Sequence, residues 1–352
     1  MAAQSTTRGR LRRLAELRPE RGRVLSIFFN LDPSEFATPP ARATEINSVV
    51  TAAAHKVEEL DGLEHDERAA LRADVERVRE VLQGSDVAAN GTHGLAVYAC
   101  GPADLLEIVR LAHPIESRAV VDDHPCVEPL IRSGPDERWC VLLVNRKTAR
   151  IFVGEATGLQ EVDHLEGDTH RQHDQGGWSQ ARFQRSVEQE KLNHLGEALD
   201  TLFTRFKRRP FDHLVVGAPD ELVGEVEQRL HPYLRDRLAG RLHVDVENSS
   251  AEQVRAASAD VVDAHVAEVE REALDRFKQG VGRGDRGAAG VSAVMEALQQ
   301  ARVDTLLLAE DFDAPELDDA LEKAITQSAR IIVVRHHDDL TPHQGIGAVL
   351  RF

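Results

Sequence analysis

The apolar residues of this chain fall into short runs that alternate with longer segments in which they recur every three or four positions. The short runs at 24–31, 139–144 and 213–217 predict buried strands. The longer segments predict helices with one apolar face each. A chain that alternates strands and helices in this way forms mixed α/β domains, and 352 residues suffice for two or three of them.

Turn-forming residues divide the chain into three predicted domains. Residues 1–134 form an α/β domain that ends among the turn formers at 133–136. The middle domain covers 135–279, and a C-terminal α/β domain covers 280–352. The glycine run from Gly280 to Gly290 lacks the Gly-Lys-Ser/Thr ending of a phosphate-binding loop, so we interpret it as a hinge or linker.

In the first domain, the strand at 24–31 precedes a long helix after Pro39 and Pro40, a second helix, and strands at 94–100 and 105–112. The apolar faces of the two helices consist of Val49, Val50, Ala53, Val57 and Leu60, and of Leu71, Val75, Val78 and Leu82.

The middle domain opens with a predicted hairpin of 140–145 and 149–154, which a polar loop rich in His and Asp joins to a glycine pair and a long helix. The apolar stripe of that helix is Leu192, Leu195, Leu199, Leu202, Phe203 and Phe206. A partly parallel sheet with covered faces is expected from the elements that follow, at 213–217, 222–230, 242–246 and 251–278. The last domain continues with a helix, a strand, a helix and a strand at 291–301, 303–309, 317–325 and 331–334.

Composition limits the kinds of partner. A net charge of −17 repels nucleic acid over the chain as a whole, so RNA contact has to come from local basic segments. No apolar run approaches the roughly 20 residues that span a bilayer, and no signal peptide follows the N-terminal arginines, which predicts a cytoplasmic protein without membrane contact. Three separate cysteines predict reduced core residues and no thiolate metal site: Cys100, Cys126 and Cys140.

A pair of glycines, Gly176 and Gly177, stands shortly before the long amphipathic helix of the middle domain. Adjacent glycines let the backbone approach a crowded partner closely. Ser179 can cap the helix, and Arg182 and Arg185, three apart, lie on neighbouring turns. A bendable tip followed by cations suits a phosphate-bearing partner.

The string Gly-Gly-Trp-Ser-Gln-Ala-Arg-Phe-Gln-Arg, which ends at Arg185, resembles the Gly-Gly-Gln loop and the Ser-Ala-x-Arg-Phe-x-Arg helix of archaeal and eukaryotic class I peptide chain release factors. The ending 345–352 resembles the closing strand of their third domain, which the Pelota family shares, so the likeness covers about 215 residues. The resemblance implies a ribonuclease-H-like middle domain and a release-factor/Pelota-like C-terminal domain. Trp178 replaces the family's loop glutamine, and Gly177 to Gln180 fits the Gly-x-x-Gln pattern of related quality-control tRNA hydrolases.

The resemblance, to the bacterial branch of this superfamily, implies a ribosome-associated protein for rescue or quality control that hydrolyses peptidyl-tRNA in the A site. Stop-codon reading is not expected, because nothing in 1–134 resembles the codon-reading motifs. Gly176 and Gly177 would give backbone access, and Gln180 would place the attacking water. The expected partners are rRNA and peptidyl-tRNA, with a translational GTPase as a further candidate, no DNA, and neither metal nor cofactor. The RNA-contacting set is Trp178, Ser179, Arg182, Arg185, Lys191, Lys207, Arg208 and Arg209.

Four alternatives stay open. Trp178 could plug the peptidyl-transferase centre of an idle ribosome, as in a non-catalytic hibernation factor, or the glycines could form a purely structural turn. A metal-dependent hydrolase would use His170 and His173 with flanking carboxylates at Asp168 and Asp174, although His-rich loops are usually solvated. The segment Lys207 to Arg209 could simply complement the negative end of its helix.

Overall fold

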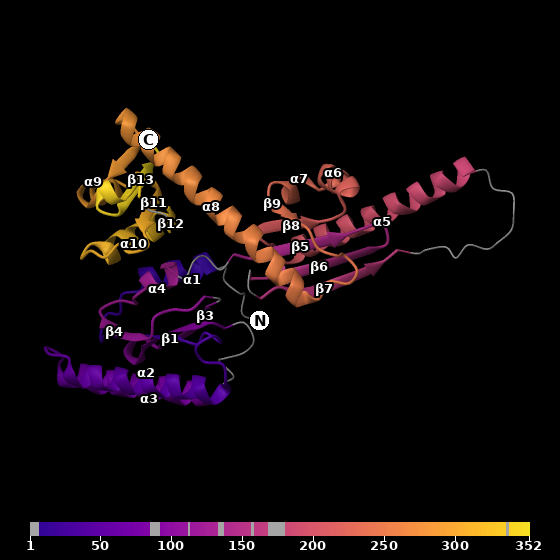
Figure 1. Ribbon diagram of the computed structural model, residues 1–352. Helices are drawn as coiled ribbons and strands as arrows, with labels where there is room; N and C mark the ends of the chain where they lie inside the picture. Colours follow the sequence, from indigo (N-terminus) through magenta and orange to yellow (C-terminus); the bar gives the residue numbers. More distant parts are fainter. Residues whose placement is uncertain are drawn as a thin grey trace. The chain divides into compact units, whose positions relative to one another are not determined.

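The computed structural model describes residues 7–84, 92–111, 113–132, 137–155, 158–167, 180–335 and 338–352, with the side chains of residues 7, 8, 84 and 180–191 left out. Two compact units divide the chain: unit 1 consists of 1–136 with 269–352, and unit 2 of 137–268. The described residues form several sheets covered by helices, which confirms the mixed α/β class (Figure 1). The division at 134 and 279 stays a prediction.

The first sheet of unit 1 has the antiparallel order β3-β2-β1-β4. Residues Leu25, Ile27 and Phe29 of its central strand β1 face the predicted apolar stripes of two helices, and Phe28 faces the opposite side. Both stripes are confirmed, except that Leu60 is only half-buried at the end of its helix. The elements are β1 (Val24–Asn30), β2 (Gly94–Cys100), β3 (Leu105–Leu111), β4 (Arg118–Asp122), α2 (Pro39–Glu59) and α3 (His65–Gly84).

Three elements of this part were not predicted: α1 (Thr7–Glu16), α4 (Glu128–Arg132) and strand β4. Helix α1 is rich in arginine, and α4 is only five residues long. Strand β4 lies at the edge of the sheet, where four of its residues are half-buried and Arg118 is exposed, so its sequence carries little apolar signal.

The second sheet of unit 1 has the order β10-β13-β11-β12, with β11 and β12 parallel and α10 between them in the chain. Ala273, Leu274 and Phe277 of the helix α8 (Ala251–Arg283) pack on one face of it, and α9 and α10 on the other. The predicted elements of 291–352 are confirmed. The elements are α9 (Val291–Gln299), β11 (Val303–Ala309), α10 (Leu317–Thr326), β12 (Arg330–Val334) and β13 (Ile346–Leu350), together with the unpredicted strand β10 (Gly287–Ala289).

The glycine run is not a linker, so that interpretation is wrong. Helix α8 (Ala251–Arg283) continues through Gly280 and Gly282, and Gly287 opens β10. The chain turns back at Gly284, where φ is +70°. A Cβ built on Gly280 would lie 2.5 Å from the carbonyl carbon and oxygen of Arg286, so glycine permits two backbones to touch.

Unit 2 is built on a sheet of order β7-β6-β5-β8-β9, antiparallel from β7 to β5 and parallel from β5 to β9, as the predicted partly parallel sheet requires. The long helix α5 and the helix α6 cover one face, and Val254 of α8 packs on the other. The elements are β5 (Trp139–Val144), β6 (Thr148–Gly154), β7 (Gln160–Glu166), α5 (Gln180–Arg208), β8 (His213–Gly217), α6 (Asp220–Arg229), α7 (Pro232–Arg235) and β9 (Leu238–Leu242).

Two predictions in unit 2 are wrong. The strand expected at 242–246 is β9, which ends at Leu242. The carboxylate of Asp245 accepts hydrogen bonds from the backbone N–H groups of Glu247 and Asn248, and this turn stops the extended chain. The polar loop expected after 154 contains β7, an edge strand whose polar residues reach solvent while Val162 and Leu165 pack on the core.

All three cysteines are buried thiols, as predicted. Burial raises the pKa of Cys126 to about 12 and holds the pKa of Cys140 still higher. The thiolate is the nucleophile, and at pH 8 only about one part in 10⁴ of a thiol with a pKa of about 12 is present as thiolate.

We expect iodoacetamide to leave Cys126 and Cys140 unmodified in the native protein and to alkylate both in 8 M urea, measured by peptide mass spectrometry. Rapid native alkylation of either would contradict the packing described.

Within the part of the chain that the structure describes, no helix combines the length and apolar character needed to cross a bilayer.

Candidate functional site

The long helix α5 connects the predicted glycine tip to the core of unit 2. It begins at Gln180, directly after the proposed cap position, and runs for 29 residues. Its C-terminal half carries the buried stripe Leu195, Leu199, Leu202 and Phe206, so this half is held on the sheet. In Figure 1 its first turns extend beyond the sheet.

Of the three predicted catalytic residues, the structure describes only the backbone of Gln180. Gly176, Gly177, Trp178 and Ser179 lie outside the described residues, and Gln180 is the first residue of α5. The backbone of α5 includes Arg182, Arg185 and Lys191, whose side chains are likewise outside the description. The roles assigned to these residues stay predictions.

The polypeptide leaves the sheet for this segment at Gly167, where it contacts α5. The Gly167 N–H donates to the carbonyl oxygen of Lys147 at 2.6 Å. A Cβ on Gly167 would lie 3.2 Å from Nδ1 of His194, whose two ring nitrogens are buried and have no hydrogen-bond partner among the described residues. A side chain at this position would press against His194 in the middle of α5, and glycine avoids that contact.

The C-terminal end of α5 is basic. Lys207 and Arg208 close the helix, Arg209 follows, and all three side chains are exposed. Cations at this end are favoured by the helix dipole whether or not RNA binds. Arg205, one turn earlier, is engaged instead: it pairs with Asp163 on β7, donating from Nη2 to Oδ1 at 2.9 Å. Arg205 therefore ties β7 to α5.

Aromatic rings lie beside Lys207, one of these cations. The ring of Phe203 stacks on His231 with centroids 4.0 Å apart, and Nζ of Lys207 lies 4.9 Å from the Phe203 centroid. Tyr233, 60% exposed, follows at 5.0 Å from His231. We call this surface the basic–aromatic end of α5: Phe203, Lys207, Arg208, Arg209, His231 and Tyr233.

Rings next to cations are the groups with which proteins hold single-stranded RNA, since bases stack on rings and phosphates pair with cations. Sequence reasoning identified the cations but missed the rings, because His231 and Tyr233 come from the segment around α7 and no local pattern connects them to α5.

The two ends of α5 cannot belong to one catalytic site. At 1.5 Å per residue, Gln180 and Lys207 are about 40 Å apart along the helix. A tip that performs chemistry and a basic end that anchors are the roles that this separation allows.

Metal binding finds little support in the described residues. The predicted ligands His170 and His173 lie outside them. One group of three potential ligands, Asp122, Asp123 and His124, comes together in unit 1, where Nδ1 of His124 lies 2.5 Å from Oδ1 of Asp123. The imidazole thus already has a carboxylate partner.

Comparison with known proteins shows which family this part of the chain resembles. Residues 125–265 match the family described as bacterial archaeo-eukaryotic release factor family 10. That stretch holds the whole sheet of unit 2, α5 and the glycine pair. This stretch of the chain is therefore similar to the archaeo-eukaryotic release factor superfamily. The resemblance seen in the Gly-Gly string is therefore confirmed.

Two curated relatives of the chain are archaeal. Peptide chain release factor subunit 1 of Thermoplasma acidophilum is 28% identical over 185 residues, covering 49% of this chain and 43% of the relative. The protein of the same name from Aeropyrum pernix is 27% identical over 203 residues, covering 55% and 54%. The chain thus spans about half the length of the curated relatives it matches.

Solved structures of the superfamily are more distant. An archaeal translation termination factor, aRF1, has 19% identity and a TM-score of 0.28, with 98% of each chain covered. Pelota of Archaeoglobus fulgidus has 17% identity and a TM-score of 0.35, and Dom34 of S. cerevisiae has 9% and 0.46, each covering 74% of this chain and 79% of its own.

Proposed function

We propose that this chain is a cytoplasmic, ribosome-associated protein that hydrolyses peptidyl-tRNA in the A site during ribosome rescue or quality control, without reading a stop codon. The observation that carries the proposal is the family match over 125–265, which includes the Gly-Gly string directly before α5. The long helix gives that string a support that reaches beyond the sheet (Figure 1).

The chemistry assigned to the tip is water attack on an ester. Water adds to the carbonyl carbon that joins the peptide to the tRNA, the tRNA 3′ oxygen leaves, and it takes up a proton. Gly176 and Gly177 let backbone N–H groups approach the oxyanion that forms, and Gln180 orients the water. Preorganised donors of this kind need neither metal nor covalent nucleophile.

The basic–aromatic end of α5 is assigned to anchoring. It lies about 40 Å from Gln180 along α5, a separation that lets it hold rRNA while the tip reaches the peptidyl-transferase centre. Lys207, Arg208 and Arg209 would pair with backbone phosphates, and Tyr233 would stack on an unpaired base. A translational GTPase that delivers the protein fits this role as a partner.

The test uses ribosomes that carry labelled peptidyl-tRNA in the P site and an empty A site. Gly177→Ala and Gln180→Ala are expected to lower the rate of peptide release at least ten-fold at saturating protein, because the tip loses backbone freedom or its water-placing group. Binding to the ribosome, measured by co-sedimentation, should stay within two-fold. The combined variant Lys207→Ala, Arg208→Ala and Arg209→Ala is the matched comparison and should weaken binding, more so at higher salt.

One alternative function has an observation in its favour. Trp178 stands where release factors carry glutamine, as expected of a hibernation factor that plugs an idle ribosome without catalysis. Stable binding of the wild type without release, lost in Trp178→Ala, would select this alternative. If the wild type neither binds nor releases at low salt, both ribosomal functions are contradicted.

A further inference from the structure

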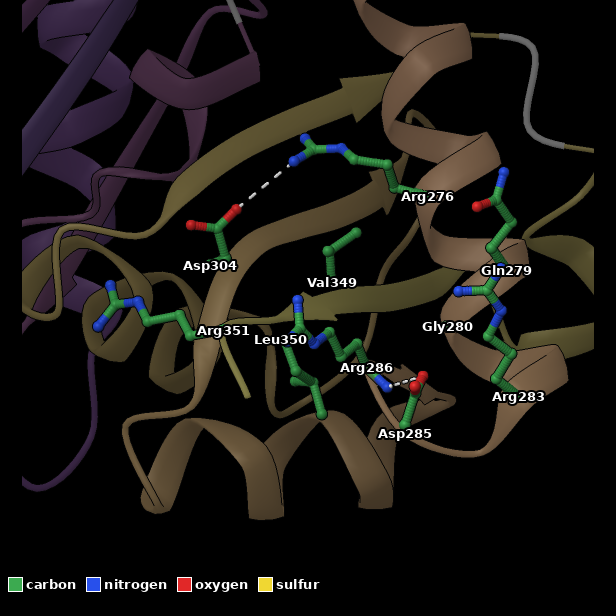
Figure 2. A pocket seen from close by; sticks show the side chains of 10 residues that line it. All are labelled: Arg276, Gln279, Gly280, Arg283, Asp285, Arg286, Asp304, Val349, Leu350 and Arg351. Carbon is green, nitrogen blue, oxygen red and sulfur yellow. Dashed lines mark hydrogen bonds and ion pairs between the residues drawn. The ribbon is translucent and has the colours of Figure 1, made fainter.

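A groove lined by arginines lies at the C-terminal end of α8, within unit 1 (Figure 2). Its volume is about 720 Å³, within the size range of small-ligand sites. We call it the arginine groove. Its lining is Arg276, Gln279, Gly280, Arg283, Asp285, Arg286, Asp304, Val349, Leu350 and Arg351.

Rigid elements hold these side chains. The end of α8 supplies Arg276 and Arg283, and a closed turn supplies Arg286. In that turn the Asp285 N–H donates to the Gly280 carbonyl at 3.2 Å, and the Arg286 carbonyl accepts from the Leu350 N–H of β13 at 2.9 Å. The backbone that carries the arginines is therefore fixed before any ligand arrives.

The acidic residues of the lining are already engaged. Asp304 lies 3.7 Å from Nη1 of Arg276, and the Asp285 carboxylate accepts from the backbone N–H of Arg286 at 2.6 Å. Arg351 donates to the carbonyl oxygen of Gln327 at 2.8 Å, a neutral partner.

Two guanidinium groups remain, those of Arg283 and Arg286, which are exposed and have no ion-pair partner among the residues that the structure describes. In a chain with 60 acidic residues and a net charge of −17, most arginines could find a carboxylate. A groove with four arginines and two acids, both acids engaged, is a local positive site.

We propose that the arginine groove binds phosphate groups, in a free oligophosphate or in the backbone of RNA. Guanidinium forks match phosphate oxygens in pairs of parallel hydrogen bonds, and Gln279 adds a neutral donor. No aromatic ring lines the groove, so the recognised part is the phosphate and not a base.

The structure also sets the order of importance within the groove. Arg283 and Arg286 make the main contacts, because neither has to leave a carboxylate. Arg276 contributes less while Asp304 neutralises it. Removing the charge of Asp304 is therefore expected to strengthen binding, a change of opposite sign to that of the arginine variants.

The experiment uses the purified full-length protein without ribosomes, with fluorescein-labelled oligouridylate and inorganic triphosphate as separate probes at low salt. Arg283→Ala with Arg286→Ala should weaken binding at least ten-fold, and Asp304→Asn should tighten it two-fold or more. The matched control is Arg21→Ala with Arg330→Ala, which removes two charges from exposed arginines of unit 1 outside the groove. Circular dichroism melts should show all variants folded.

The two probes distinguish the sources of phosphate. If the arginine pair binds oligouridylate, the double variant should show a weaker salt dependence than the wild type. The slope of the logarithm of the association constant against the logarithm of the salt concentration should become shallower by about 1.4, the value for two phosphate contacts to a single strand. If it matters for triphosphate alone, the ligand is a free oligophosphate. Equal affinities of the groove variant and the control, or no binding of either probe by the wild type, would overturn the proposal. Peptide release by ribosomes is independent of these results, so this proposal and the proposed function can fail separately.

Discussion

Gly280→Ala is expected to destabilise unit 1 by about 2–3 kcal/mol, whereas Gly282→Ala, two residues later in the same helix, is expected to stabilise it by up to about 1 kcal/mol. Both glycines lie in the last turns of α8. The opposite signs come from their surroundings and not from helix propensity.

The Cβ of an alanine at 280 would lie 2.5 Å from the carbonyl carbon and oxygen of Arg286 and 2.8 Å from the nitrogen of Gly287. These are backbone atoms of β10 and the turn before it, so relief requires moving a strand that pairs with β13. A Cβ at 282 would have no atom within 4 Å. Alanine there only restricts the unfolded chain.

Urea unfolding followed by circular dichroism measures both changes, and hydrogen exchange in β13 locates them. Tryptophan fluorescence is the internal control, because the two tryptophans of the chain, Trp139 and Trp178, lie in unit 2. Gly280→Ala should leave the fluorescence transition in place. Equal stability of the two alanine variants would show that 280–290 is a loose linker after all.

Arg150→Ala is expected to destabilise unit 2 by about 2–4 kcal/mol. The guanidinium of Arg150 is buried, and it donates to Glu161 from Nε at 3.0 Å and from Nη2 at 2.5 Å. Nη1 donates to the carbonyl oxygens of Ser249 at 2.7 Å and Val246 at 3.3 Å. One side chain thus joins β6 to β7 and to the loop before α8, and its loss leaves several acceptors without a donor.

Arg241 provides the matched control in the same unit. It makes the same two-point contact with Glu227, at 2.7 and 2.9 Å, on an exposed surface. Water replaces the lost contact there, so Arg241→Ala should cost far less. In a Trp178→Phe background, fluorescence of the buried Trp139 reports unfolding of unit 2. Similar losses for the two variants would contradict the importance given to burial.

The effect of Arg150 should depend on pH. Its hydrogen bonds hold the pKa of Glu161 below the ordinary glutamate value. A depressed carboxyl pKa stabilises the fold above the unfolded value and loses that contribution as the pH falls through the folded value. The stability difference between wild type and Arg150→Ala should therefore be full at neutral pH and shrink below about pH 4.

Periodicity predicted the elements with strong apolar patterns and missed those without. The stripes of α2, α3 and α5 and the fully apolar strand β5 were predicted because their burial leaves a repeat in the sequence. Strand β7 was missed because an edge strand keeps polar residues at exposed positions. The strand at 242–246 was misplaced because Leu242, Val244 and Val246 alternate like a strand, although β9 ends at Leu242 and the other two pack from the turn that follows.

For the candidate site, too, the sequence predicted local features and missed the contacts between distant segments. Local order in the sequence determined the family, through a Gly-Gly string followed at fixed spacing by a helix with Arg182 and Arg185, because spacing along a helix is a local property. Only the tertiary structure decided that Arg205 is occupied by Asp163, that His231 stacks on the Phe203 ring beside Lys207, and that Arg283 and Arg286 share a groove with Arg351. Such juxtapositions depend on how distant segments pack, and side-chain type alone does not encode which segments meet.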